Sequence, residues 1–466
     1  MKRLISASCI LLAVPAAAWS GEKPAPTETV VRLKVYAAPA PKPIQKYHLL
    51  PELRMMNPGN PIQGYLKCFS EQNPFFFSKQ SMDEREKWVD MPLKDLPVEK
   101  LRHYGGIALR NADYAARLDH PDWQVLLQLK SAGIELLVPD LQQMRILAGA
   151  LRVRLRGEIA DHRFDDALVT AQTMFALSRH TAEHPTLIAY LVSASLANIA
   201  AGPLEEMVAQ PGCPNLFWAL TDLPHPLINV HRAVQGERIF LMKEFDLVDP
   251  RAPMSDAQVQ KVVDRFQALH HLTVFNPARE KLKPELRDWF ADRARDQAYV
   301  TAARKRLIEY GTAREMVKNF SALQVVFLDE KHHFLEWRDE AFKGMTLPYW
   351  QGEPLLAVKK FKNDSPITRM VPIRAGDKVR QAQARLEQRI VILRCIEAMR
   401  MYAAENDGKL PAQLADISLP LPVDQLSGKA FHYKLDGNTA TLHGTPPPRL
   451  KNDPNYNVRY EITIAR

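Results

Sequence analysis

The stretch HTAEHP at residues 180–185 carries the residue types that bind zinc in one class of metallopeptidase. In the pattern H-x-x-E-H, two histidines one helical turn apart hold the metal, and the glutamate deprotonates a metal-bound water. Those positions are His180, Glu183 and His184. The chemistry requires a helix that continues through both histidines.

Pro185 argues against that chemistry, because a proline disfavours the helical conformation of the residue before it. We therefore expect the helix to end before His184 completes the turn. Glu244 and Glu280, further along the chain, do not fall where inverted-motif peptidases place their third ligand. We interpret the stretch as the polar end of one helix before the next, and we predict no metal and no cofactor.

No other catalytic motif is present in the sequence. The patterns G-x-S-x-G, G-x-x-x-x-G-K-[ST] and G-x-G-x-x-G are all missing, so no catalytic residue is assigned. The adjacent pairs His270-His271 and His332-His333 split across helix faces and make poor chelates. Tyr349 and Trp350, in LPYWQGEP, either line a sugar or peptide groove or lock a helix end onto the core.

The first twenty residues have the form of a secretory signal peptide. Two positive charges precede an apolar run from Leu4 to Trp19, and small residues offer cleavage after Ala18 or Ser20. An uncleaved anchor is the alternative, but the run is shorter than the roughly 20 residues of a spanning helix and contains Pro15. We expect an exported protein, periplasmic or associated with the cell envelope.

Export leaves Cys68, Cys213 and Cys395, an odd number without a C-x-x-C pattern. The sequence allows one disulfide among these three cysteines, but three scattered cysteines cannot form the framework of the fold. With 466 residues and 46% apolar composition, the chain can instead build two or three packed domains.

The positive charge of the chain is concentrated in one segment. Loss of Lys2 and Arg3 with the signal lowers the formal charge from +9 to +7, and residues 355–400 alone hold eleven Lys or Arg against four acids. The rest is balanced, which argues against a nucleic-acid partner. Either this segment is a solvated linker and helix face, or its basic residues, with Lys359, Lys360 and Lys362 as candidates, bind an anionic envelope surface.

The central chain predicts stacked helical hairpins. Apolar residues recur every three or four positions over 141–159, and a tight turn at 161–163 leads into a second amphipathic helix from Phe164, as in a tetratricopeptide unit. The uncharged run between Pro185 and Pro203 is at the short limit of a membrane helix and holds several polar residues. We interpret it as a buried central helix, so no transmembrane segment is expected after signal removal.

Helices are predicted near residues 227–245, 255–271, 285–310 and 320–344. The fold class is therefore mainly α, with a small C-terminal α+β module. The predicted parts are a signal peptide at 1–20, an extended segment at 21–96 that contains one strand and wraps the body, a helical body at 97–350, a basic linker at 351–375, and the module at 376–466.

Several stretches together resemble a large paralogous group of exported helical proteins of planctomycete type. They include KYHLLPELRMMNPGNP, PGCPNLFWALTDLPHPLI and FLEWRDEAFKGMTLPYW. The resemblance spans nearly all of the mature chain. It implies no activity, since no reaction is assigned to that group.

The C-terminal segment resembles the helix and small sheet of type II secretion pseudopilins. Gly408 and Pro411 fit the G-x-x-P element that ends the helix, and Asp424, Gly428 and Tyr433 fit the turn and strand that follow. Gln425 and Ala430 depart from that pattern, which has proline at these positions, and filament assembly does not carry over to a module at the C-terminus. We expect Asp424 and Gly428 to form a turn, with strands near 431–435, 439–443 and 459–464.

These observations favour an exported scaffold or protein-interaction protein of the cell envelope, whose partner is another envelope protein or an anionic envelope surface. Stacked helices offer broad concave surfaces for binding. Two alternatives remain open: an enzyme acting on envelope polymers through a site that no linear motif reveals, and an accessory of a secretion apparatus that docks through the C-terminal module.

Overall fold

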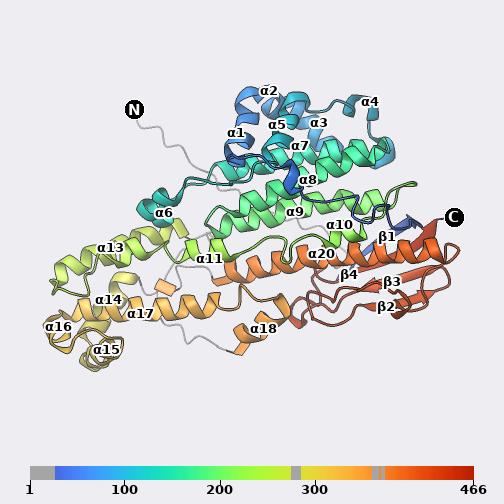
Figure 1. Ribbon diagram of the computed structural model, residues 1–466. Helices are drawn as coiled ribbons and strands as arrows, with labels where there is room; N and C mark the ends of the chain where they lie inside the picture. Colours follow the sequence, from blue (N-terminus) through green and yellow to red (C-terminus); the bar gives the residue numbers. More distant parts are fainter. Residues whose placement is uncertain (1–26, 274–284, 359–366, 369–372, 466) are drawn as a thin grey trace, which may run out of the picture.

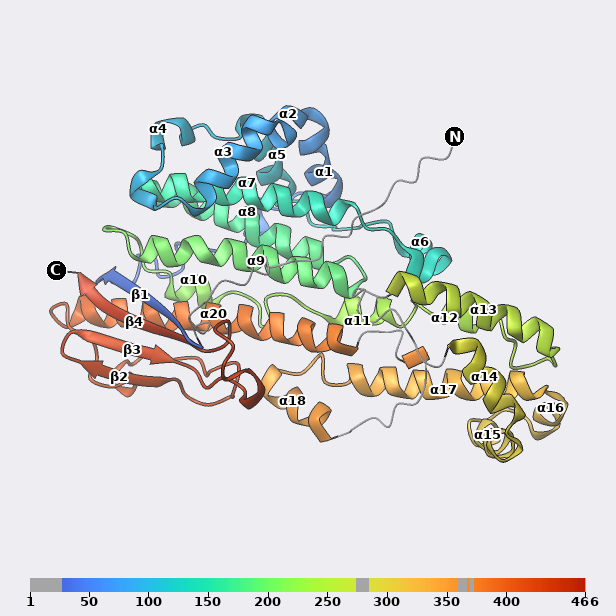
Figure 2. The same ribbon diagram turned by 180° about the vertical axis from the view of Figure 1, so that it is seen from behind.

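The computed structural model describes residues 27–273, 285–358, 367–368 and 373–465. Long helices lie side by side in layers, with short N-terminal helices on one side, a small sheet at one end and a second group of helices at the other (Figure 1, Figure 2). The predicted mainly α fold with a small C-terminal α+β module is confirmed. The signal peptide predicted at 1–20 lies outside the described residues.

Helices α7 (Asp140–Ala160) and α8 (Phe164–Ala182) form the predicted hairpin. The turn between them passes through His162, whose φ is 56°. Asp165 and Asp166 lie in the first turn of α8, where negative charge stabilises the N-terminal end of the helix dipole. The hairpin packs its apolar side against the next layer of helices. The apolar residues that recur every three or four positions are therefore the buried ones.

The third layer is α9 (Leu187–Val208), the uncharged run that the sequence predicts as a central helix. Among the described helices it is the one that is long and apolar enough to cross a membrane by length and composition, and 67% of its most apolar window is buried. It lies between α8 and α20 (Ile373–Glu405) in Figures 1 and 2. The predicted burial of this helix is therefore confirmed.

The predicted helical body at 97–350 contributes to two large cores. The first surrounds the α7–α9 layers, and the second is an aromatic cluster built from residues 241–337. The second core places Phe245, Phe266, Phe290, Phe327 and Phe334 within 6.0 Å of a neighbouring ring. Its helices are α12 (Met242–Phe245), α13 (Asp256–Thr273), α14 (Leu286–Arg295), α15 (Gln297–Glu309), α16 (Arg314–Asn319) and α17 (Ala322–Phe342).

The sheet joins the two ends of the described chain. Its strand order is β1-β4-β3-β2, with β1 parallel to β4 and the other pairs antiparallel. Thr29 pairs with Val458 and Tyr36 with Ala465, so the strand near the N-terminus completes the C-terminal module. The strands are β1 (Thr29–Tyr36), β2 (His432–Asp436), β3 (Thr439–His443) and β4 (Val458–Ala465).

Two of the predicted boundaries need correction. The segment 21–96 is extended only in part, because residues 61–90 form helices whose apolar side chains belong to the first core. The linker predicted at 351–375 begins within α18 (Tyr349–Val358). The N-terminal helices are α1 (Pro61–Glu71), α2 (Asn73–Phe77), α3 (Lys79–Asp90), α4 (Val98–Leu101), α5 (Gly106–Ala115) and α6 (Leu126–Ala132).

Many of the described cations of α20 point into the protein. Arg400 is fully buried, pairs with Glu397 of the same helix and donates to the Cys213 carbonyl, and Arg389 donates to both oxygens of Glu205 on α9. Arg394 lies over the ring of Phe217 in α10 (Phe217–Thr221). Breaking a buried ion pair costs about 3–5 kcal/mol. These arginines therefore fix α20 to its neighbours and do not form a free basic face.

Candidate functional site

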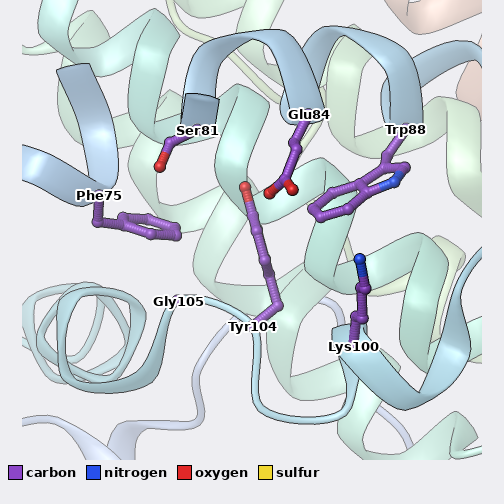
Figure 3. Close-up of a pocket in the computed structure, with 7 residues that line it drawn as sticks. All are labelled: Phe75, Ser81, Glu84, Trp88, Lys100, Tyr104 and Gly105. Carbon is purple, nitrogen blue, oxygen red and sulfur yellow. The ribbon is translucent and has the colours of Figure 1, made fainter. Parts of the chain in front are cut away.

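A pocket lies on the N-terminal helices, lined by side chains of α2, α3 and α4 and by the turn before α5 (Figure 3). Local sequence signals place these helices. Asn60 accepts a hydrogen bond from the Ile62 amide at the start of α1, with Pro61 in the first helical position. Ser78 accepts one from the Ser81 amide at the start of α3. Of the helices that line the pocket, α3 is therefore the one that begins at a side-chain cap.

Three aromatic rings form the walls of the pocket. The ring centroid of Tyr104 lies 5.2 Å from that of Phe75 and 5.9 Å from that of Trp88, with interplanar angles of 63° and 81°. These edge-to-face contacts are favourable because the positive ring edge meets the negative face. Together the rings line part of an open cavity of about 280 Å³.

Polar groups of both charges lie around these rings. In Figure 3 the Glu84 carboxylate lies between the rings of Tyr104 and Trp88, and the Lys100 chain extends toward Trp88. Ser81 adds a hydroxyl on the side of Phe75. The turn that carries Tyr104 passes through Gly105, whose φ of 81° is unstrained for glycine, and a Cβ there would overlap Leu109.

Arg85 holds the Phe75 side of the pocket from behind. This side chain is 8% exposed, and its guanidinium donates to the Phe75 and Phe76 carbonyls at 3.1 and 3.0 Å. It also lies 5.7 Å from the centre of the Phe75 ring. Burial raises the pKa of Tyr104, and the nearby Arg85 partly offsets that rise. The last carbonyls of α2 are therefore satisfied by a buried cation, which fixes the position of Phe75.

Arg156 of α7 holds the Trp88 side in the same way. Its guanidinium donates to the carbonyls of Trp88 at 2.6 Å, Val89 at 2.9 Å and Met91 at 2.6 Å. Its charge is balanced by Glu206, at 2.7 Å. The end of α3 is thereby tied to the central hairpin, so the pocket walls are set before any ligand arrives.

The pocket is suited to binding more than to covalent chemistry. The Ser81 hydroxyl accepts a hydrogen bond from the Ser78 hydroxyl at 2.9 Å, so its described partner is another hydroxyl and not a base. An activated serine needs a base within hydrogen-bond reach. Three rings with a carboxylate, an ammonium and a hydroxyl at their edge can instead orient a small amphipathic group.

The HTAEHP stretch has the structural role that the sequence predicts. Helix α8 ends at Ala182, and the His180 and His184 rings make separate contacts. His180 shares a hydrogen bond with the Tyr65 hydroxyl at 3.0 Å, and His184 with the Thr186 hydroxyl at 3.0 Å. Burial lowers the pKa of both histidines to about 4.

Glu183 faces a different partner, Arg232, at 3.7 Å. Within the described ranges, no group of three or more His, Cys, Asp or Glu is arranged to hold a metal ion. The absence of zinc stays a prediction. The geometry shows that His180, Glu183 and His184 each serve packing or surface pairing at the junction of α8 and α9.

Tyr349 and Trp350 lock α18 onto the C-terminal module. Tyr349 is 7% exposed and packs with Leu426 and Tyr456, while its carbonyl accepts a hydrogen bond from Arg380. A Cβ on Gly428 would strike the ring of Trp350. The sequence left two interpretations open, a sugar or peptide groove and the packing of a helix end onto the core. These contacts agree with the packing of a helix end. The other candidates for a binding surface, Lys359, Lys360 and Lys362, lie outside the described residues.

A second polar cluster lies on α17. Tyr299 and Arg306 of α15 donate to Asp329, at 3.2 Å for the hydroxyl and 2.7 Å for the closer guanidinium bond. Burial raises the pKa of Glu330, and the His333 ring lies 3.9 Å from both acids. Because Arg306 binds both oxygens of Asp329, this cluster ties α15 to α17 and leaves little of that carboxylate for a substrate.

The aromatic pocket was not predicted from the sequence, in which residues 21–96 were interpreted as an extended segment that wraps the body. Two capping signals were readable: Asn60 followed by Pro61, and Ser78 at the start of a polar helix. The meeting of Phe75, Trp88 and Tyr104 could not be read, since it depends on how three short helices pack.

The described residues form a mainly α protein with a small pocket lined by aromatic rings. Comparison with known protein families, with curated proteins and with solved structures finds no match to this chain.

Proposed function

We propose that the protein is an exported helical scaffold of the cell envelope that binds one other envelope component without transforming it. The observation that carries this proposal is the aromatic pocket, whose walls are held by two buried arginines, Arg85 and Arg156. A rigid site loses little conformational freedom when it binds, so more of the contact energy appears as affinity.

Two further features support binding over catalysis. The hydroxyl in the pocket, on Ser81, is bonded to Ser78, and Asp329 of the α17 cluster is paired with Arg306. Export to the envelope follows from the signal-like first twenty residues. In the described ranges the cations of α20 are largely engaged with protein groups, which favours the pocket over a basic face as the recognition surface.

The test compares the wild-type chain with two variants in native cells. A tagged chromosomal copy is gently cross-linked and purified, with Phe75→Ala as the pocket variant and Met82→Ala as the control, because Met82 is 53% exposed on the neighbouring helix and does not line the pocket. We expect one envelope component to be recovered with wild type and Met82→Ala, and at least about tenfold less with Phe75→Ala, as for a buried anchor of an interface.

Equal recovery with Phe75→Ala would contradict the proposal. A hydrolytic activity that copurifies with the protein and disappears with a single substitution in the α17 cluster, such as Glu330→Gln, would favour the enzyme alternative.

A further inference from the structure

Two neighbouring acids of α17 are buried, and one histidine lies beside both of them. Asp329 is fully buried and Glu330 is 1% exposed. The Nδ1 atom of His333, about one turn further along the helix, lies 3.9 Å from one carboxylate oxygen of each acid. We infer that Glu330 and His333 form a pH-sensitive switch, which holds α14 and α15 closed on α17 when His333 is protonated.

The two acids differ in their partners. Arg306 of α15 donates to both oxygens of Asp329, at 2.8 and 2.7 Å, and the Tyr299 hydroxyl donates to the same carboxylate at 3.2 Å. Among the residues that the structure describes, the buried Oε1 atom of Glu330 has no hydrogen-bond partner. Glu330 therefore depends on the His333 ring for a close opposite charge.

The nearest arginine of α14 does not replace His333. Arg293 attracts the Glu330 carboxylate, but its guanidinium lies over the rings of Tyr299 and Trp289, 4.9 and 5.6 Å from their centres. In the described part of the chain, the ion pair of Glu330 is the one with His333. A buried carboxylate that loses its one close cation is costly, because little water reaches it.

The adjacent histidine, His332, has different surroundings. Its ring stacks on that of Tyr310 at a centroid distance of 4.2 Å, and the Tyr310 hydroxyl donates to Glu336 at 2.8 Å. Burial lowers the pKa of His332, and the charge of Lys331 acts in the same direction. His332 is therefore neutral in the pH range in which His333 loses its proton.

Both members of the pair act in the same direction with pH. Interaction with Glu330 raises the pKa of His333 above its usual 6.5, and burial raises the pKa of Glu330 above 4.5. A group whose pKa is raised in the folded state contributes stability that is present at low pH and is lost as the pH rises. For His333 the loss begins near pH 6.5, and neutral His333 then leaves a buried charge that favours opening of α14 and α15 toward water.

The experiment measures amide hydrogen exchange of the purified protein by mass spectrometry at about pH 6 and about pH 8. Rates are corrected for the pH dependence of intrinsic amide exchange. We expect the protection of peptides from α14 and α15 to be at least about threefold lower at the higher pH, the factor that a partly exposed ion pair contributes. The pocket on the N-terminal helices takes no part, so the result is independent of the proposed binding function.

Two variants act on the two partners separately. Glu330→Gln keeps the side-chain shape and removes the charge, and His333→Lys keeps a positive charge at both pH values. Either change should abolish the fall in protection, and Glu330→Gln should be better protected than the wild type at about pH 8. Glu309→Gln, at an exposed acid of α15 that pairs with Lys305, is the matched control and should keep the wild-type fall.

Equal protection of α14 and α15 in the wild type at both pH values would overturn the inference. So would a Glu330→Gln variant that keeps the fall, or that is less protected than the wild type at about pH 8, because the pair would then serve packing alone. If Glu330→Gln does not fold, His333→Lys decides: loss of the fall in that variant supports the switch, and its retention overturns it.

Discussion

His184 is 2% exposed and is held by Thr186 and the edge-to-face ring of Trp123. Burial lowers its pKa to about 4, well below the usual 6.5 of a histidine. Between pH 6.5 and 4, His184 is therefore protonated in the unfolded chain and neutral in the folded chain. Stability carried by this residue is full above pH 6.5 and is lost as the pH falls toward 4.

Between pH 7 and pH 5, we expect His184→Gln to lose less unfolding free energy than the wild type, by on the order of 2 kcal/mol. The measurement is urea unfolding at both pH values, with the exposed His231→Gln as control. Burial raises the pKa of Glu158 and Glu237 to about 7, so these residues change the stability with pH in the opposite direction. The pH dependence of the wild-type unfolding free energy is the sum of all these contributions. The contribution of His184 is therefore the difference between the wild type and His184→Gln. An identical pH dependence in His184→Gln would contradict this account.

At the scale of elements, the junction after HTAEHP is a site of close packing. Gly236 of α11 (His231–Glu237) lies against the backbone of Pro185, and a Cβ on this glycine would overlap the Pro185 carbonyl oxygen. The next residue, Glu237, accepts a hydrogen bond from the Leu187 amide at 2.9 Å and places a carboxylate at the N-terminus of α9. The stretch with metallopeptidase-like letters thus serves to dock α11 onto α9.

Gly236→Ala should therefore lower the unfolding free energy by about 1–3 kcal/mol, because the backbone must move to admit a methyl group. Gly149→Ala is the matched control: it is also inside a helix, and its Cβ would meet no atom closer than 3.8 Å. That control should be neutral or stabilising by about 0.5–1 kcal/mol. Thermal and urea unfolding of both variants decide the matter, and equal stabilities would rule out the close approach.

The pseudopilin-like segment is joined to the body through its long helix. The long helix α20 is fixed to α9 through Arg389 and Glu205 and to the region near Cys213 through Arg400. Gly428, with a φ of 70°, and Asp424 form the turn that the sequence predicts. Because its helix is buried in the body, the module is packed as part of the fold.

At the scale of the whole molecule, the first and last strands close the structure. Val35 of β1 is fully buried in the core beneath the sheet, and β1 covers the edge of β4 along eight residue pairs. Arg32 and Lys34 are exposed on this edge strand, where charged side chains discourage pairing with other molecules.

Deletion of residues 21–36 should expose the β4 edge and cost more than about 4 kcal/mol, an exceptional loss that reflects a missing part of the core. We expect a lower melting temperature and concentration-dependent aggregation, followed by light scattering. The exposed single substitution Lys34→Thr is the control and should change the melting temperature little. A deletion variant that melts like wild type would show that the sheet is stable without β1.

The sequence by itself determined the helices and strands whose patterns repeat locally. The α7–α8 hairpin, the buried α9 and the three C-terminal strands were all predicted, because apolar spacing and turn residues act over a few positions. Pro185 likewise indicated that His180 and His184 end a helix. These features depend on neighbours in the chain, which one sequence displays in full.

Tertiary structure alone decided which distant residues meet. The pairing of β1 with β4 and the inward direction of the α20 arginines depend on packing between segments far apart in sequence. The pocket of Phe75, Trp88 and Tyr104 depends on how neighbouring short helices pack. A charge count shows that residues 355–400 are basic, but not that Arg389 and Arg400 find acids inside the protein. Local patterns fix the elements, and burial of their apolar faces fixes the partners from which the candidate site is made.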